Sequence, residues 1–572
     1  MTYTIISKET FPFSDQKPGT SGLRKTTKTF LQTNYTENYL QAIFNTLKGR
    51  IELGGVTLVV GGDGRYHNKY VIEKILIPMA AANRIAKLII GLNGLLSTPA
   101  ASHLIRKYGA DGGIILTASH NPGGLNFDFG IKFNLSNGGP CTDKVSNELY
   151  NETLQISSYV TVLESMEIDL SEVQNKSYII SENIFTIIVV DSVEQYCKYL
   201  KKIFDFQSLL KMLTGDDGLP PMLVIADAMH GVMGPYVRRI LGDELKVPFD
   251  NMIHCDPLED FGSNHPDPNL TYARNLVEIM TESTFDFGCA FDGDGDRNMI
   301  LGSKGFFVSP SDSLAVIADN LKIIPYFKRK GIQGFARSMP TSRAVDRVAQ
   351  KHGIMLHEVP TGWKFFGNLM DTYQISLCGE ESFGMGSNHI REKDGLWSVL
   401  AWLSVLSFLR HKEHKLISVE SVIESHWKRF GRNFYTRYDY EACKSEDGDE
   451  IMKILQKLIR QPTTVGRAYK SGEKEYKIKL CNNFTYLDLV DETTSTNQGV
   501  QFTFMDDSRI IFRLSGTGSQ GSTVRIYAET YESDPSKIKV GQSEKLKPLI
   551  DVALEICQIQ SVTGRNNPTV IT

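Results

Sequence analysis

The chain has 572 residues, a length that suggests about three to five domains. Apolar residues make up 41% and charged residues 22%, which is typical of globular proteins and excludes a disordered or fibrous chain. Sixty-two Lys and Arg against 66 Asp and Glu give a net charge of −4, which argues against a general nucleic-acid binder but leaves room for a local basic pocket.

One strand–helix–strand pattern occurs three times along the chain. Strands that alternate with amphipathic helices favour βαβ units and mainly parallel sheets, so we expect three related α/β domains. The predicted strands are Val56–Val60, Leu88–Leu92, Met222–Ala226, Gly334–Arg337 and Ile354–Val359. The predicted helices are Lys69–Asn83, a segment ending near Leu241, and Thr341–Lys351.

The C-terminal region has a different pattern, typical of an α+β domain with a mainly antiparallel sheet. A polar stretch, Glu441–Glu450, predicts a surface loop. The strand-like segments are Phe434–Tyr440, Tyr476–Leu480, Phe484–Leu489, Gln501–Phe504, Ile510–Phe512 and Val524–Glu529. We place the four domains at residues 1–205, 206–322, 323–425 and 426–572.

Several features predict a cytoplasmic protein with no integral membrane association. Residues 1–20 are polar and lack the apolar segment of a secretory signal. The most apolar run, Ile184–Val190, is far shorter than the ~20 residues of a spanning helix. Eight scattered cysteines without a C-x-x-C pair suit a reducing compartment and argue against a zinc ribbon or a disulfide framework.

The first candidate motif, Thr117–Gly124, follows the apolar strand Ile114–Leu116. A serine that leaves a buried strand in a Pro/Gly turn is exposed, and the free N–H groups of the turn can hold an anion. Ser119 is thus a candidate nucleophile, and His120 could supply a proton or a charge. The alternative is a turn that only ends a strand. A serine hydrolase is disfavoured because the G-x-S-x-G elbow is missing.

The second motif, D-G-D-G-D-R, follows the apolar strand Gly288–Phe291. In extended backbone, residues two apart point to one side, so the three carboxylates converge and need a cation. Oxygen ligands select Mg²⁺ or Ca²⁺. An EF-hand is excluded because Arg297 and Ser303 occupy its sixth and twelfth positions. The alternative is a solvated acidic turn. The candidate ligands are Asp292, Asp294 and Asp296.

The third motif comprises C-G-E-E-S-F-G at residues 378–384 and H-I-R-E-K-D-G at residues 389–395. The carboxylate of Glu380 and the hydroxyl of Ser382 suit the vicinal hydroxyls of a sugar. Lys393 could act as an acid or base if burial and Arg391 lowered its pKa. Alone, the motif is equally compatible with a charged loop.

The fourth motif, R-L-S-G-T-G-S-Q-G at residues 513–521, matches the glycine spacing of a dinucleotide fingerprint. That fingerprint must open a helix, whereas Ser522–Glu529 continues as a strand, so we reject it. The hydroxyls, the backbone N–H groups and two arginines, Arg513 and Arg525, still suit phosphate. The alternative is a flexible hairpin turn. Arg24, in a basic turn-rich segment, and Thr361 with Gly362, after the strand ending at Val359, could reach the same ligand.

With these motifs in this order, the chain resembles the phosphoglucomutases of the α-D-phosphohexomutase superfamily from residue 17 to its end. The resemblance implies four domains around a deep central cleft, three related α/β domains with mixed, mainly parallel sheets and a divergent C-terminal α+β domain, each contributing one motif.

The resemblance also implies roles for individual residues. Ser119 matches the phosphorylated serine. The implied catalytic residues are Ser119, His120, Lys132, Lys393 and Arg297. The implied Mg²⁺ ligands are Asp292, Asp294, Asp296 and the Ser119 phosphate. The implied substrate contacts are Arg24, Thr361, Gly362, Glu380, Ser382, Arg513, Ser515, Gly516, Thr517 and Arg525.

The activity implied is the interconversion of glucose 1-phosphate and glucose 6-phosphate, an isomerase-class phosphotransfer through a phosphoserine and glucose 1,6-bisphosphate. The bisphosphate must turn over in the cleft, and closure of the fourth domain would exclude water. The alternatives are a phosphomannomutase or dual-specificity hexomutase, and a parafusin-like protein with an added membrane-fusion role. The expected partner is a hexose phosphate and not a nucleic acid. The oligomeric state, monomer or dimer, stays open.

Overall fold

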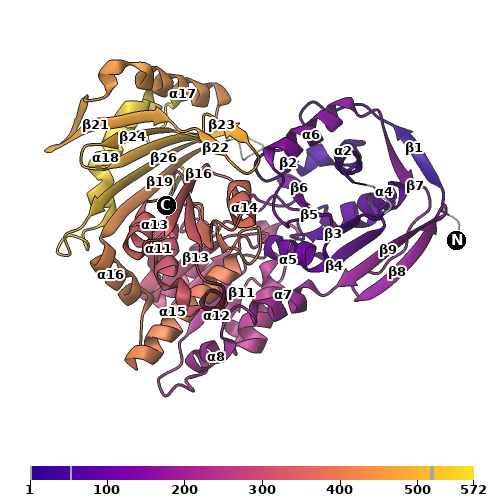
Figure 1. The fold of residues 1–572 in the computed structure, drawn as a ribbon, viewed down its shortest axis with the longest axis horizontal. Helices are drawn as coiled ribbons and strands as arrows, with labels where there is room; N and C mark the ends of the chain where they lie inside the picture. Colours follow the sequence, from indigo (N-terminus) through magenta and orange to yellow (C-terminus); the bar gives the residue numbers. More distant parts are fainter. Residues whose placement is uncertain (1–2, 52–54, 516–520) are drawn as a thin grey trace.

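The computed structural model describes residues 3–51, 55–515 and 521–572. Four sheets of four or more strands divide this part of the chain into successive regions: the N-terminal one lies at the right of Figure 1 and the C-terminal one at the upper left. The first three sheets mix parallel and antiparallel strands, and the last is antiparallel. The predicted fold class, three related α/β domains followed by a divergent α+β domain, is confirmed.

The N-terminal sheet has seven strands with a parallel centre. In spatial order they are β2 (Leu23–Thr26), β6 (Asp128–Leu135), β5 (Gly112–Leu116), β3 (Thr57–Gly62), β4 (Lys87–Leu95), β9 (Asn183–Val190) and β8 (Gln174–Ile180). Side chains of β3 alternate between the two faces, as expected for a strand. Val59 packs in the same apolar cluster as Leu104 of α5 (Thr98–Tyr108), whereas Leu58 and Val60 pack with α2 (Tyr35–Lys48).

The three α/β sheets share one arrangement of four strands, in the spatial order fourth, third, first, second. In the first domain these strands are β6, β5, β3 and β4. In the second they are β13 (Asn298–Gly302), β12 (Phe287–Phe291), β10 (Val224–Asp227) and β11 (Met252–Ile253). In the third they are β18 (Met385–Ser387), β17 (Leu377–Gly379), β15 (Gly334–Ser338) and β16 (Met355–Val359).

In each copy the first three strands are parallel and the fourth turns back against the third. The connection between third and fourth strands is therefore a hairpin at the carboxyl end of a buried parallel strand, where open α/β sheets place their ligands. These three hairpins carry residues 117–127, 292–297 and 380–384, which are the first three predicted motifs. The repeated topology thus presents the three motifs at equivalent positions.

The C-terminal sheet is built around a long antiparallel pair, β19 (Arg432–Cys443) with β26 (Ser522–Glu532), flanked by β25 (Arg509–Ser515). The prediction of a surface loop at Glu441–Glu450 is wrong. β19 continues to Cys443, and α17 (Ser445–Arg460) starts soon after it. Two acidic residues of this stretch, Glu446 and Asp447, occupy the first turn of α17, where the helix dipole favours negative charge, while Ile451 and Leu455 are buried beneath the helix.

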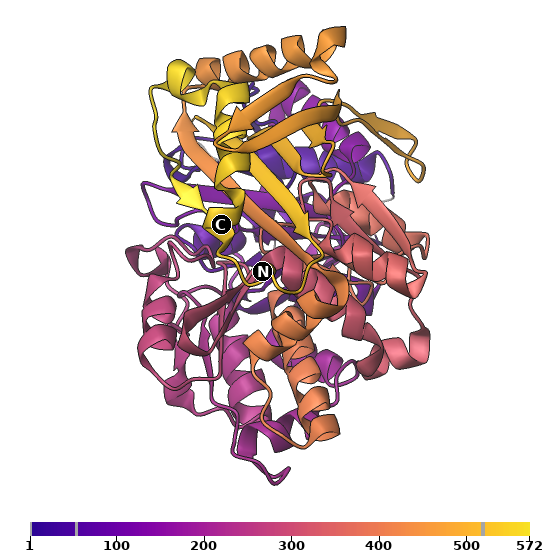
Figure 2. The same ribbon diagram turned by 90° about the vertical axis from the view of Figure 1, so that its left-hand side faces the viewer.

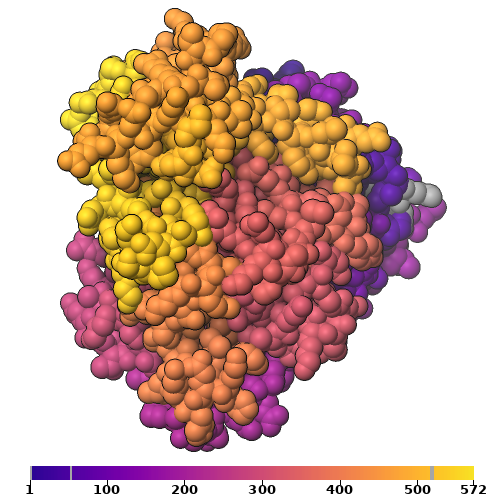
Figure 3. Space-filling view, turned by 60° about the vertical axis from the view of Figure 1, so that its left-hand side comes forward, coloured from indigo at the N-terminus to yellow at the C-terminus, as the bar shows by residue number. Residues whose placement is uncertain are grey.

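The apolar cores distinguish the C-terminal domain from the rest. One cluster spans the sheets of the first three domains and includes Ile115, Phe291 and Phe335. The C-terminal sheet and its helices, among them α18 (Gln542–Cys557), form a separate cluster that includes Phe512 and Leu549. Figure 2 shows this domain at the top of the molecule, and Figure 3 shows its orange and yellow surface lying against the pink third domain. Among the described helices, none combines the length and apolar character needed to cross a membrane.

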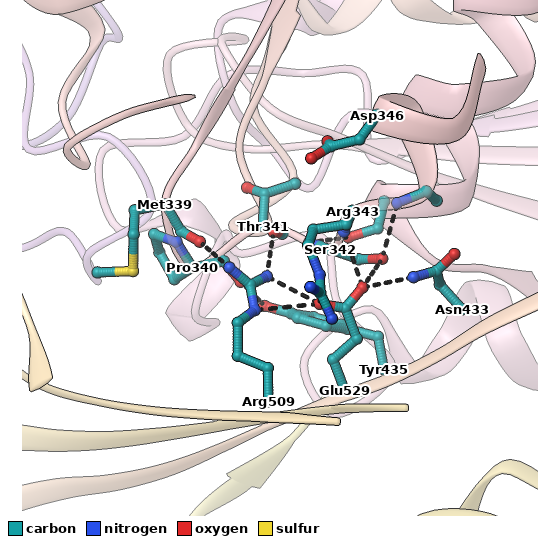
Figure 4. A network of polar contacts seen from close by, with 12 residues as sticks. Met339, Pro340, Thr341, Ser342, Arg343, Asp346, Asn433, Tyr435, Arg509 and Glu529 are labelled. Atoms are coloured by element: carbon teal, nitrogen blue, oxygen red, sulfur yellow. Dashed lines mark hydrogen bonds and ion pairs between the residues drawn. The ribbon is translucent and has the colours of Figure 1, made fainter. Parts of the chain in front are cut away.

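A buried polar network joins the third and fourth domains (Figure 4). Arg509 donates to the backbone oxygens of Met339 (2.9 Å) and Thr341 (2.8 Å), in the loop after β15, and its Nη2 lies 2.8 Å from Oε2 of Glu529 on β26. Glu529 also accepts from the Ser342 hydroxyl and the Arg343 backbone N–H, at 2.8 and 2.7 Å. Despite burial, the arginines around it lower the pKa of Glu529 to about 2.

We expect Glu529→Gln to destabilise the protein by about 3 kcal/mol, because it removes the nearest carboxylate from buried Arg509 and leaves only Glu358, 3.7 Å away. Because folding lowers the pKa of Glu529, its charge stabilises the folded state at pH values above the unfolded-state pKa. The full loss of stability should therefore be seen at neutral pH. It should shrink as the pH falls from about 4.5 toward 2. Chemical denaturation at several pH values measures it. The control is Glu532→Gln, on the same strand as Glu529, which breaks a more exposed ion pair with Lys545. We expect it to lower the free energy of unfolding by less than about 1 kcal/mol. Equal losses for both variants would contradict the proposed importance of this network.

Candidate active site

Ser119 lies in the hairpin between β5 and β6 in a left-handed backbone conformation, with φ of 53°. The conformation is held by a buried brace: the Thr117 hydroxyl accepts from the Ser119 N–H at 2.8 Å and donates to Asp63, and Arg65 donates to the Ser119 carbonyl at 2.9 Å. Arg65 and Asp63 form a fully buried ion pair. A strained backbone held this firmly fixes the direction of the Ser119 hydroxyl.

The Ser119 hydroxyl points at the second domain. Its Oγ donates to Oδ2 of Asp292 at 2.8 Å, across the interface between the first and second domains. The Nδ1 of His120 lies 3.3 Å from the Ser119 Oγ. Burial and the positive charges of Arg297 and Arg24 hold the pKa of His120 well below its usual value. His120 is therefore in its neutral form.

The three aspartates of the second hairpin converge as the sequence predicted. Asp292, Asp294 and Asp296 are buried, and one carboxylate oxygen from each lies within 4.8 Å of the others. Burial and the two neighbouring carboxylates raise the pKa of Asp292 well above its usual value. Within the described part of the chain, Oδ1 of Asp294 and Oδ1 of Asp296 accept no hydrogen bond. Buried oxygens left without donors fit a hard divalent cation.

Two lysines flank the aspartates. The Nζ of Lys393 lies 3.2 Å from Oδ2 of Asp296, and the Nζ of Lys132 lies 3.1 Å from Oε1 of Glu392. Burial favours the neutral amine of Lys132, but the carboxylates around it, led by Glu392, outweigh this and raise its pKa. Lys132 therefore stays cationic and is suited to neutralising phosphate charge rather than to removing a proton.

The third hairpin brings two glutamates into different roles. Glu381 accepts from the hydroxyls of Ser338 and Thr341, at 3.0 and 3.3 Å, and so is tied into the third domain. Glu380 accepts from the Gly362 N–H at 3.0 Å, which joins two of the predicted sugar-contact segments. Within the described residues, the buried hydroxyl oxygen of Thr361 has no hydrogen-bond partner.

All four domains line one cavity of about 260 Å³ in front of the Ser119 loop. His120 comes from the first domain, Arg297 from the second and Ser382 from the third, while Arg525 lies opposite on β26 of the fourth. Arg513 is the cross-strand partner of Arg525 on β25, and Ser515 ends that strand. Gly516 and Thr517 lie outside the described residues. On β2, Arg24 experiences the field of Asp294, Asp296 and Arg297.

Several residues of this cavity carry no signal in the sequence motifs. His265 and Asp267 come from the loop that follows β11, and Arg437 and Asp439 come from β19. Arg437 and Asp439 are two residues apart on a strand and therefore share a face, a spacing that could have indicated them. The Asp63–Arg65 brace and Glu392 were also missed, because their roles depend on contacts between distant segments.

Comparison with known proteins matches every domain to one family. Residues 15–160, 194–305 and 309–430 match the models of phosphoglucomutase/phosphomannomutase alpha/beta/alpha domains I, II and III, and residues 432–569 match that of the phosphoglucomutase-1 C-terminal domain. The chain is 52% identical to human phosphoglucomutase-1 over 571 residues, covering 99% of this chain and all of that protein. It is 48% identical to human phosphoglucomutase-like protein 5, covering 99% of each. The crystal structure of the exocytosis-sensitive phosphoprotein pp63/parafusin, a phosphoglucomutase from Paramecium in an open form, superposes with a TM-score of 0.88 at 45% identity, covering all of both chains.

Proposed function

The chain belongs to the phosphoglucomutase/phosphomannomutase family, and we propose that it is an enzyme that interconverts glucose 1-phosphate and glucose 6-phosphate through a phosphoserine at Ser119. The observation that carries the proposal is the contact between the Ser119 hydroxyl of one domain and Asp292 of the next, at the edge of a cavity that all four domains line. A serine beside a metal-type carboxylate cluster and a cationic cavity suits phosphoryl transfer.

In the proposed reaction, a sugar hydroxyl attacks the phosphorus of phosphorylated Ser119. The new P–O bond forms to the sugar while the bond between phosphorus and Oγ breaks. The proton of the attacking hydroxyl passes to Oγ, which leaves as the Ser119 hydroxyl, and His120, whose Nδ1 lies 3.3 Å from Oγ, relays it. Lys132, Lys393 and Arg297 neutralise charge on the phosphoryl group. Asp292, Asp294, Asp296 and the Ser119 phosphate would hold Mg²⁺, which would add further charge neutralisation.

The product of this first transfer is glucose 1,6-bisphosphate, which must turn so that its other phosphate faces Ser119. We assign the phosphate that is not reacting to Arg513, Ser515, Gly516, Thr517 and Arg525, with Arg24 as a further substrate contact. Thr361, Gly362, Glu380 and Ser382 would contact the sugar hydroxyls in either orientation. A C-terminal domain with its own apolar core can move as a unit, which would let it open for the turn and close for transfer.

A coupled assay with each hexose 1-phosphate tests the substrate. We expect glucose 1-phosphate to be converted with a kcat/KM at least about tenfold above that of mannose 1-phosphate, because the site must distinguish one hydroxyl orientation by hydrogen bonding. Equal or better conversion of mannose 1-phosphate would replace the proposal with a phosphomannomutase or dual-specificity hexomutase. We also place the protein in the cytoplasm, because all eight cysteines are free thiols.

Glu380→Gln tests the sugar contact. Its amide oxygen can still accept from the Gly362 N–H, but a donor replaces the second carboxylate oxygen, so kcat/KM should fall by about 10- to 100-fold. The melting temperature should change little. The neighbouring Glu381→Gln is the matched control, since its carboxylate accepts from Ser338 and Thr341, and it should lower the melting temperature instead. The opposite pattern would assign the sugar contact to Glu381.

A further inference from the structure

A second cavity, of about 690 Å³, opens among the first, second and third domains, away from the one in front of the Ser119 loop. It lies among the end of α5, helix α7 (Ser192–Leu200) and the helical segment η3 (Arg238–Glu244). Among their described lining residues, the two cavities have none in common. Its volume is in the range of cavities that bind small molecules.

The cavity carries a strong positive charge in a protein whose net charge is −4. Two carboxylates face six cationic side chains, an excess of four positive charges. Glu194 pairs with Lys198 and Arg239, and Glu244 pairs with Lys201 and Arg239. The six cations are Arg106, Lys107, Lys198, Lys201, Lys202 and Arg239.

Three of these cations have no carboxylate partner among the described residues: Arg106, Lys107 and Lys202. Arg106 donates to the backbone of Asn137, and Lys107 donates to the neutral side chain of Gln195. Partial burial and the nearby charges of Lys198 and Lys202 lower the pKa of Lys107. Among the described residues, no ion pair offsets the positive charge of these three side chains.

The floor of the cavity is aromatic and rigid. The ring of His103 stacks on that of Tyr199 with centroids 4.1 Å apart, and the Tyr199 hydroxyl donates to the His389 carbonyl at 2.6 Å. His103 and His389 are buried, and burial lowers the pKa of His103 to about 3, so its ring is neutral. The cations therefore surround an open hollow whose base is formed by these aromatic rings, so that several positive charges face one volume.

We propose that this cavity binds a small polyphosphorylated anion, with a di- or triphosphate group held by Arg106, Lys107 and Lys202. A chain of linked phosphates matches both the volume of the hollow and its excess of positive charge. Because the cavity is separate from the one facing Ser119, the proposal does not depend on the mutase reaction.

Calorimetric titration of inorganic tripolyphosphate into the full chain, without divalent cations, tests this inference. We expect a binding site that is weakened at least tenfold in Lys107→Glu/Lys202→Glu. It should persist within twofold in Lys453→Glu/Lys457→Glu, which makes the same change in net charge on exposed positions of α17. It should also persist in Arg513→Ala/Arg525→Ala, which removes cations from the other cavity.

Three results would overturn the inference: no binding by the unmodified chain, equal binding by Lys107→Glu/Lys202→Glu, or loss of the site in Arg513→Ala/Arg525→Ala. Lys107 and Lys202 are exposed, so their replacement should leave the melting temperature unchanged. If it falls, Lys107→Gln/Lys202→Gln provides the same comparison with a smaller change in charge. Unchanged turnover of glucose 1-phosphate in either variant confirms that the fold is intact.

Discussion

Replacing Ser119 with alanine is expected to reduce the conversion of glucose 1-phosphate to glucose 6-phosphate by at least about 10⁴-fold, because Ser119 is the proposed phosphoryl carrier. The replacement removes only a hydroxyl that donates to Asp292, so the fold should persist. A coupled assay measures the turnover. Intact-mass analysis after incubation with glucose 1,6-bisphosphate should show one added phosphoryl group on the unmodified chain, mapped to the Ser119 peptide, and none on Ser119→Ala.

Ser421→Ala, at an exposed position of α16 (Val419–Phe430), is the control and should retain both activity and labelling. Two outcomes would refute the role of Ser119. One is a Ser119→Ala protein that still gains a phosphoryl group, and the other is a label on a different peptide of the unmodified chain. Loss of labelling together with a large fall in melting temperature would instead point to damage to the hairpin. Circular dichroism of Ser119→Ala would detect such a loss of folded structure.

The strands and the hairpins that carry the site could be predicted from the sequence because each functional loop directly follows a short apolar strand. β5 and β12 are buried along their whole length, and the polar residues after them stand out against such segments. The predicted helix Lys69–Asn83 corresponds to three consecutive helical segments, α3 (Asn68–Tyr70), η2 (Val71–Leu76) and α4 (Ile77–Ala82). In these segments the local pattern of apolar and polar residues was sufficient to predict the strand or helix.

What the sequence could not provide depends on contacts between distant segments. Asp63 and Arg65 brace the Ser119 loop from the end of another strand, and Glu392 meets Lys132 across two domains. Arg437 and Asp439 reach the cavity only because β19 lies beside β26 in the C-terminal sheet. The prediction of a loop at Glu441–Glu450 failed for a related reason. Glu446 and Asp447 form the start of a helix whose buried face includes Ile451 and Leu455, which follow this segment in the chain.

The aspartate cluster gives the second large effect, in which activity and stability should change in opposite directions. In the metal-free protein Asp292 is buried beside two other carboxylates, and its raised pKa shows that its charge is unfavourable there. Asp292→Asn keeps the shape of the side chain and removes that charge. The melting temperature of the metal-free protein should therefore stay the same or rise, while turnover with Mg²⁺ should fall by about 10³-fold.

Titration of Mg²⁺ during thermal unfolding separates these effects. Binding to the folded state alone should stabilise the unmodified chain by about 2.7 kcal/mol at a hundredfold excess over Kd. Asp292→Asn should lose most of that gain, whereas Asp250→Asn, at an exposed position, should retain it. If the metal-free Asp292→Asn protein were strongly destabilised, the carboxylate would be a structural acceptor for the Ser119 hydroxyl and the Arg297 N–H, and the cluster would not be a cation site. Only a cation site explains a rise in stability together with a loss of both the Mg²⁺ response and turnover. Carboxylates that are brought together at a cost to folding are useful only when a ligand neutralises their charge.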